Sequence, residues 1–205
     1  MSEPSKASGY KGTSAKAYKN TGKGNTEEGY TDKMKKNILG AEQKIRNNKD
    51  ESAYVFDSKG NLVDITKGKG AEVNMARATV PQDAIITHNH PRSIGTTGIR
   101  RIGNAFSSDD LNFAVYKNAK EMRAVTPTYT FSVKRPKGGW GDRAQIIKRY
   151  NEISNKLINE GNRWLANSSY SIYDTRKTRL EVAHTDRIMK QLAKEFGWKY
   201  SKKRG

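Results

Sequence analysis

The feature that most constrains the fold is a short apolar run that ends in two histidines and a proline. Residues 84–87, AIIT, are typical of a buried central strand. That strand must end at Pro91, because proline has no N–H to donate to a sheet ladder. Since successive side chains on a strand point to opposite faces, His88 and His90 should lie side by side at the strand's end.

A second motif follows this strand and its loop. Ser107 and Asp110 form a Ser-x-x-Asp pattern before an apolar-periodic stretch, which predicts a helix from Ser107 to about Ala119. The ordinary role of such a pattern is a capping box at the helix N-terminus, and that interpretation stays open. The same helix start would also bring the Asp110 carboxylate back toward the two histidines.

Together these residues predict a metal site. The chain has no cysteine, so any metal ion must be held by His, Asp or Glu. A catalytic zinc ion requires three protein ligands and one open position for water, and His88, His90 and Asp110 supply the three ligands. We therefore predict zinc as the cofactor.

Two further residues complete the predicted chemistry. A zinc-activated water needs a carboxylate to take its proton, and Glu51, at the start of an upstream strand, is the candidate general base. Glu72 is the competing candidate for that role. The Ser107 hydroxyl is the candidate hydrogen-bond donor to the oxyanion of a tetrahedral intermediate.

Periodicity and turn residues predict the elements around this centre. A helix is expected over residues 31–47, with an apolar stripe formed by Met34, Ile38, Ala41 and Ile45. Strands are expected at 53–56, 62–66, 71–76, 122–126 and 129–134. Two long helices are expected over 142–167 and 173–196, followed by a solvated basic tail at 199–205.

The charge of the chain indicates a class of partner. The net charge of the 205 residues is +18, which favours nucleic acid or another polyanion. The basic arm at 1–30, the loop at 92–105 and the C-terminal tail could carry that contact. The alternative is that the lysines only solvate a protein with a small core. No apolar stretch could span a membrane and the N-terminus lacks the apolar region of a secretory signal, so a cytoplasmic protein is expected.

The combination of motifs resembles a known family. Glu51 followed by SAYVFD, then THNHP, then FSSDDL, is similar to the pattern of the JAB metalloproteases, also called MPN or JAMM, and especially to their RadC-like and phage-borne branch. The resemblance covers roughly residues 50–125. It implies an α/β fold of the deaminase-like kind, with a mixed β-sheet flanked by helices. It also implies hydrolysis of a peptide or isopeptide bond in a protein or peptide substrate.

The resemblance assigns a role to each site residue. The family's zinc ligands correspond to His88, His90 and Asp110, its general base to Glu51 and its oxyanion donor to Ser107. The expected organisation is a flexible basic arm at 1–30, a JAB/MPN-like metalloprotease core at 31–136 and a helical C-terminal extension at 137–205.

The chain departs from the family pattern between the second histidine and the serine. The intervening segment, residues 91–106, is longer than in the family, and it is either a lid, a loop that contacts substrate or polyanion, or a tolerated surface insertion. A second function stays open. The chain could be a basic nucleic-acid-associated or phage virion-associated protein that keeps a RadC-like fold without protease activity, in a bacterial or phage-infected cytoplasm or in a virion.

Overall fold

The computed structural model describes residues 26–91, 102–166 and 175–205. Residues 1–25 of the expected basic arm, residues 92–101 of the expected loop and the start of the last expected helix lie outside these ranges. Within them, the predicted α/β fold with a mixed sheet flanked by helices is confirmed.

The centre of the molecule is a six-stranded sheet in the order β2-β1-β3-β4-β5-β6. Only β3 and β4 pair in parallel, and the other neighbouring pairs are antiparallel. The strands are β1 (Ser52–Phe56), β2 (Leu62–Lys67), β3 (Ile85–Asn89), β4 (Glu121–Val125), β5 (Tyr129–Lys134) and β6 (Lys199–Arg204). The hairpin of β1 and β2 and the strands β3, β4 and β5 lie where the sequence predicts them.

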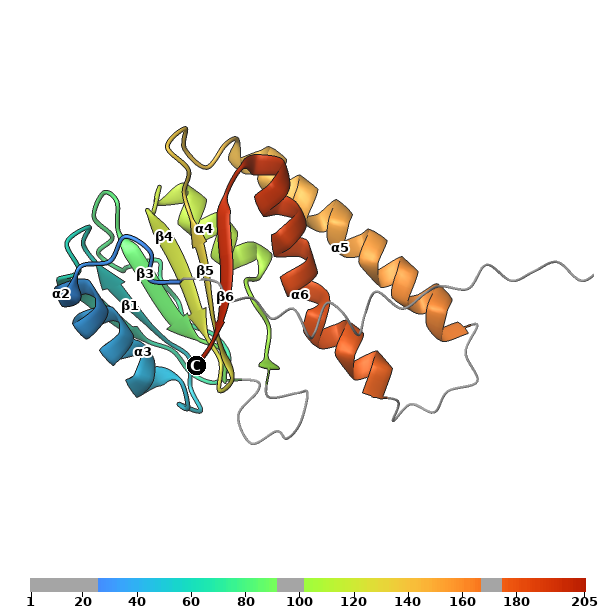
Figure 1. The fold of residues 1–205 in the computed structure, drawn as a ribbon, viewed down its shortest axis with the longest axis horizontal. Coiled ribbons are helices and arrows are strands. Elements are labelled where there is room, and N and C mark those ends of the chain that lie inside the picture. Colours follow the sequence, from blue (N-terminus) through green and yellow to red (C-terminus); the bar gives the residue numbers. More distant parts are fainter. Residues whose placement is uncertain (1–25, 92–101, 167–174) are drawn as a thin grey trace, which may run out of the picture.

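Helices cover both faces of the sheet (Figure 1). One face packs against a helical segment made of α2 (Asp32–Met34), a π-helical turn η1 (Lys35–Leu39) and α3 (Gly40–Ile45). The predicted apolar stripe of this segment is confirmed, since all four of its side chains are buried. The opposite face carries α4 (Ser108–Tyr116) and the antiparallel pair α5 (Arg143–Ala166) and α6 (Thr175–Phe196).

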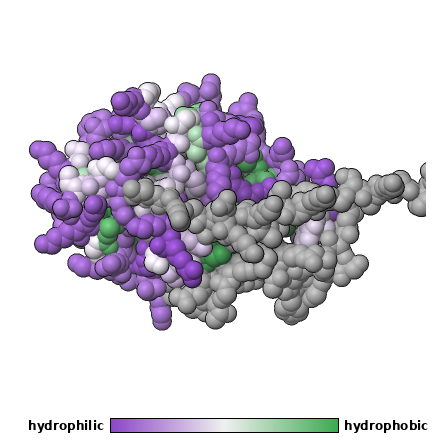
Figure 2. Space-filling model, in the orientation of Figure 1, coloured by the Kyte–Doolittle hydropathy of each residue, from purple (hydrophilic) through white to green (hydrophobic). Residues whose placement is uncertain are grey.

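The long C-terminal helices share the core of the sheet. Ile146 and Ile153 of α5 and Ile188 and Leu192 of α6 are buried in the same cluster as Phe131 of β5. No described helix combines the length and the apolar character needed to cross a bilayer. Hydrophilic side chains cover most of the described surface on the face drawn in Figure 2.

Two predicted elements are wrong. Residues 71–76 form no strand, apart from one isolated bridge between Lys69 and Glu72, because the Asn74 side chain accepts the Ala76 N–H and turns the backbone instead. The solvated tail at 199–205 is also wrong, since residues 199–204 form β6. Without β6, the edge of β5 would expose unpaired backbone N–H and carbonyl groups, and β6 pairs with them. Because side chains alternate along β6, Lys202 is buried and lies beside Asp186.

Candidate metal centre

The two histidines meet at the end of β3. His88 is buried, and its Nε2 lies 2.8 Å from Nε2 of His90. In the sheet register His88 lies opposite Ala53 of β1 and Ala124 of β4, so small neighbours on both sides leave room for the imidazole ring. The prediction that the two histidines point the same way agrees with this geometry.

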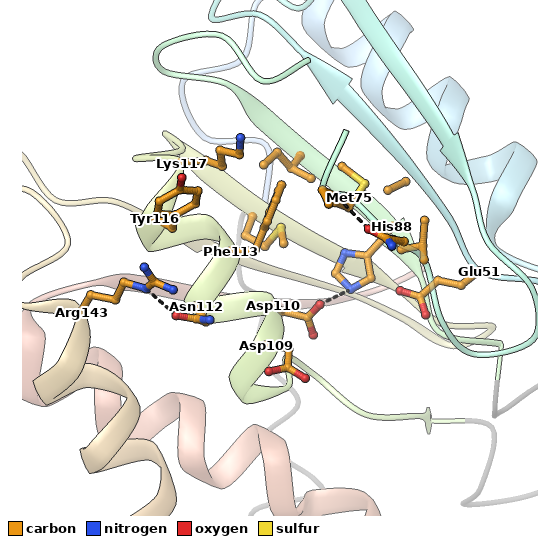
Figure 3. A pocket seen from close by; sticks show the side chains of 16 residues that line it. Glu51, Met75, His88, Asp109, Asp110, Asn112, Phe113, Tyr116, Lys117 and Arg143 are labelled. Carbon is orange, nitrogen blue, oxygen red and sulfur yellow. Dashed lines mark hydrogen bonds and ion pairs between the residues drawn. The ribbon is translucent and has the colours of Figure 1, made fainter. Parts of the chain in front are cut away.

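Asp110 comes from the first turn of α4 and joins the histidines. One carboxylate oxygen, Oδ1, lies 3.2 Å from Nε2 of His88, and the other, Oδ2, lies 3.8 Å from Nε2 of His90. Figure 3 shows this carboxylate facing the His88 ring from the helix side of the cleft. The i, i+3 spacing of the capping motif, from Ser107 to Asp110, therefore delivers a carboxylate to the strand end.

Glu51 lies on the side of His88 that faces away from α4 (Figure 3). It is buried, and ligand atoms of Glu51, His88 and His90 all lie within 4.8 Å of one another, which makes them a group that could hold a metal ion. Backbone hydrogen bonds hold Glu51 from both sides, with its N–H donating to Gly70 and its carbonyl accepting from Gly68. The competing residue Glu72 is exposed and belongs to no such group within the described ranges.

Asn89, between the two histidines, positions Glu51 through the loop that precedes β1. Its side-chain oxygen accepts the Ser52 N–H at 2.8 Å, and its amide group donates to the carbonyls of Asn48 and Asp50. Three hydrogen bonds from one amide therefore fix the backbone on both sides of Glu51.

Ser107 forms the capping box that its motif predicts. Its hydroxyl accepts the Asp110 N–H and donates to Asp110 Oδ2 at 2.8 Å, while its own N–H donates to the same oxygen at 2.7 Å. These bonds hold Oδ2, so the carboxylate cannot rotate freely away from the histidines. Ser107 is exposed and lines a cleft beside His90.

His90 is oriented by a peptide group that α6 holds in place. Nδ1 of His90 lies 2.9 Å from the Asn104 carbonyl, and the N–H of the same peptide, that of Ala105, donates to the Thr185 hydroxyl at 2.8 Å. A hydrogen bond at one end of a peptide group strengthens the bond at its other end. Thr185 therefore acts on His90 through one peptide, from a helix far away in the sequence.

The hydrogen bonds behind the histidines determine what can sit between them. Because Nδ1 of His90 faces a carbonyl, Nδ1 carries the hydrogen and a neutral His90 presents a lone pair at Nε2. His88 likewise hydrogen-bonds the backbone of Arg123 behind its ring. Two lone pairs 2.8 Å apart, next to a carboxylate, are stable only with a cation among them, either a proton or a metal ion. This donor arrangement fits a metal ion.

The electrostatics of the centre agree with that conclusion. Burial lowers the pKa of His88, but the carboxylates of Asp110 and Glu51 raise it by a larger amount. The pKa of His88 therefore lies above its ordinary value. Burial raises the pKa of Asp110, but His88 and His90 and the Ser107 backbone lower it more, so the net pKa lies well below the ordinary value. The carboxylates of Asp110 and Glu51 therefore both favour a positive charge on the imidazoles between them, a charge arrangement that suits a cation.

Two clefts open from this centre. The larger, of about 560 Å³, runs between α4 and residues 73–76, and the smaller, of about 450 Å³, is walled in part by Val182 and Thr185 of α6.

The role of Asn89 could be read from a polar side chain on a buried strand, whereas nothing near Thr185 in the sequence signals its role. No protein-family model, no curated protein and no solved structure matches the chain.

Proposed function

We propose that this protein is a zinc-dependent hydrolase of the JAB/MPN type, with a RadC-like fold, that cleaves a peptide or isopeptide bond with an activated water. The observation that carries the proposal is the convergence of His88, His90 and Asp110 beside the buried Glu51. Two imidazole nitrogens and a carboxylate oxygen, with no sulfur donor, suit zinc, and three protein ligands leave a position for water.

The residues that would hold the ion are His88, His90 and Asp110. When bound, zinc supplies Lewis acidity, which acidifies a water and polarises the scissile carbonyl. The orientation of the two rings is fixed by backbone carbonyls behind them, so little rearrangement is needed for binding.

Glu51 is the proposed proton carrier. Its carboxylate would take a proton from the attacking water and deliver it to the leaving amine, as a general base and then a general acid. Its burial keeps bulk water from competing for that proton. The hydrogen bonds of Asn89 around it keep it at the same distance from the histidines throughout.

Ser107 is the proposed oxyanion donor. Its hydroxyl donates to Asp110 Oδ2, so the role requires that the hydroxyl rotate toward the substrate. Its oxygen can meanwhile keep accepting the Asp110 N–H, which leaves the helix cap intact.

The test combines metal analysis with cleavage of a mixed peptide library by the purified protein. We expect about one zinc per chain in the wild type and in Glu51→Gln, and none in His88→Ala or Asp110→Asn. Glu51→Gln should lower the cleavage rate by about 10²–10⁴-fold, while the matched variant Glu72→Gln cleaves normally. A wild type that neither retains nor takes up zinc would exclude the proposal.

A second candidate function rests on the net charge of +18. It is a basic nucleic-acid-associated or phage virion-associated protein in which the centre has no hydrolytic role. Binding to a DNA duplex should then weaken steeply with salt and survive His88→Ala unchanged. Cleavage that disappears in His88→Ala, with weak DNA binding at physiological salt, would favour the hydrolase.

A further inference from the structure

The larger cleft connects the metal centre with a pair of cations. At one end it is lined by Glu51, His88 and Asp110, and at the other by Lys117 and Arg143 (Figure 3). Its volume of about 560 Å³ is enough for several side chains of an extended peptide. A molecule cleaved at the centre can therefore reach the cations without leaving the cleft.

The middle of the cleft is apolar. One wall comes from the segment after β2, the other from α4, and the floor from β1, β3 and β4. The apolar lining side chains include Ala53, Val73, Met75, Ile86, Phe113 and Met122. Such a lining favours an apolar side chain of the bound molecule and disfavours a sugar-phosphate backbone.

The far end of the cleft offers positive charge that the described chain does not neutralise. Among residues 26–91, 102–166 and 175–205, no ion pair involves Lys117 or Arg143. The Arg143 Nε donates to the Asn112 side chain at 2.6 Å, which fixes the guanidinium beside the cleft. The remaining guanidinium nitrogens are available for a carboxylate.

Tyr116 links the two cations at the surface. The Lys117 ammonium lies 5.4 Å and the Arg143 guanidinium carbon 5.0 Å from the centre of its ring. Tyr116 is also 63% exposed, the most exposed of the large apolar residues in the described chain. The cleft is open here, so a peptide can continue past the cations into solvent.

We propose that this cleft binds a peptide segment with an apolar residue in its middle and an internal Asp or Glu whose side chain contacts Lys117 and Arg143. Its role as a substrate subsite rests on the proposed hydrolase function, but the binding itself does not. A nucleic acid is disfavoured here, because the acidic side chains of Glu51, Asp109 and Asp110 line the same cleft and repel phosphates.

The test measures binding of fluorescein-labelled peptides by anisotropy, with protein stripped of metal by a chelator. The probes are a leucine-containing heptapeptide with one internal Glu and the same peptide with Gln, both with amidated C-termini. We expect the Glu peptide to bind about tenfold tighter, the effect of one charge-assisted hydrogen bond. The combined variant Lys117→Gln with Arg143→Gln should abolish that preference.

A charge-matched control separates local contact from general attraction. The combined variant Lys148→Gln with Arg163→Gln removes the same charge from exposed positions of α5 outside the cleft and should keep the tenfold preference. An equal loss in both combined variants would overturn the proposal. So would a preference that follows a free C-terminal carboxylate instead of the internal Glu.

The binding assay and the function can fail separately. If the metal-free wild type prefers the Glu peptide while the zinc-loaded wild type cleaves nothing, the cleft assignment stands and the hydrolase does not. If the wild type cleaves Glu and Gln peptides at equal rates and binds them equally, the hydrolase stands and the cleft assignment is overturned.

Discussion

The sheet carries a buried cluster of charged residues on each face, and the two clusters differ in the source of their cation. On the α3 face, Arg123 is fully buried and bonds Glu42 at 2.5 Å and Glu121 at 2.7 Å. On the α4 face, Asp110 is paired only with imidazoles in the described chain. The two clusters start from neighbouring positions of the sheet. Arg123 of β4 lies opposite Thr87 of β3, and His88 is the next residue along β3.

The difference shows how a buried anion is neutralised. A carboxylate inside a protein requires a positive partner, because burial without one is strongly unfavourable. Arg123 supplies that charge permanently, and the Thr26 carbonyl and two carboxylates accept four hydrogen bonds from its guanidinium. The α4 face offers histidines, whose charge depends on a proton or a metal ion. The first cluster therefore contains its own cation, whereas the second contains groups whose charge depends on a proton or on a bound metal ion.

Removing the permanent cation should have the largest effect. Arg123→Met leaves Glu42 buried without its ion-pair partner and Glu121 with only Lys134, at 3.8 Å, among the described residues. This should lower the free energy of unfolding by about 3–5 kcal/mol. Urea denaturation measures the change. Arg149→Met is the control, since Arg149 pairs with Glu195 and Glu152 on the surface, where solvent screens the charges, and its loss should cost far less stability. A loss of similar size in both variants would contradict the proposed role of Arg123.

Supplying the exchangeable cation should have the next largest effect. At a free zinc concentration one hundred times the dissociation constant, the wild type should gain about 2.7 kcal/mol of unfolding free energy. Denaturation with and without zinc measures this gain. His88→Ala and Asp110→Asn should show none of it, while Glu72→Gln keeps it in full. An equal gain in His88→Ala would place the ion elsewhere.

Another buried carboxylate, that of Asp186, tests the comparison through the pH dependence of stability. Burial raises its pKa, but Lys202, Lys190 and Tyr200 lower it more, so the folded pKa lies below the ordinary value. Its contribution to stability is therefore present above the ordinary pKa of about 3.9 and is lost as pH falls through the lower folded pKa.

The variant Asp186→Asn should remove that acid-dependent loss. At neutral pH it should cost roughly 1–3 kcal/mol, because the charged hydrogen bonds to Tyr200 and Lys190 are weakened. Thermal denaturation between pH 2 and pH 7 measures both effects. Asp32→Asn makes the same substitution at an exposed position of α2 and is the matched control. An unchanged profile in Asp186→Asn would show that Asp186 is not the group responsible.

The smallest effect should come from the peptide that orients His90. Thr185→Val keeps the shape of the side chain but removes the acceptor for the Ala105 N–H, so the zinc dissociation constant should rise about tenfold. Competition with a chromophoric chelator measures it. Thr185→Ser should restore the wild-type value. Ser154→Ala removes another hydroxyl contact, to His184 between α5 and α6, and should not change zinc affinity.

Local rules predict much of the fold and the residues of the candidate site. The alternation of side chains along a strand is enough to put His88 and His90 on one side of β3. The spacing of a capping box is enough to put Asp110 in the first turn of α4. These features depend on neighbours within a few residues, so the sequence itself contains the information.

Other features depend on contacts between distant residues. The basic residues 199–204 form a strand only because β5 presents an unpaired edge to them. Thr185 supports His90 only because α6 packs beside the segment that leads to Ser107. Glu51, and not Glu72, lies beside the histidines because Asn89 holds the backbone around Glu51 in place.

The sequence by itself determined which side chains could bind a cation, because periodicity and capping act over one or two turns of chain. The tertiary structure decided which of them meet, what holds them in place and which cleft leads away from them. The physical reason is that a hydrogen bond or an ion pair between residues 80 apart leaves no periodic trace in either segment.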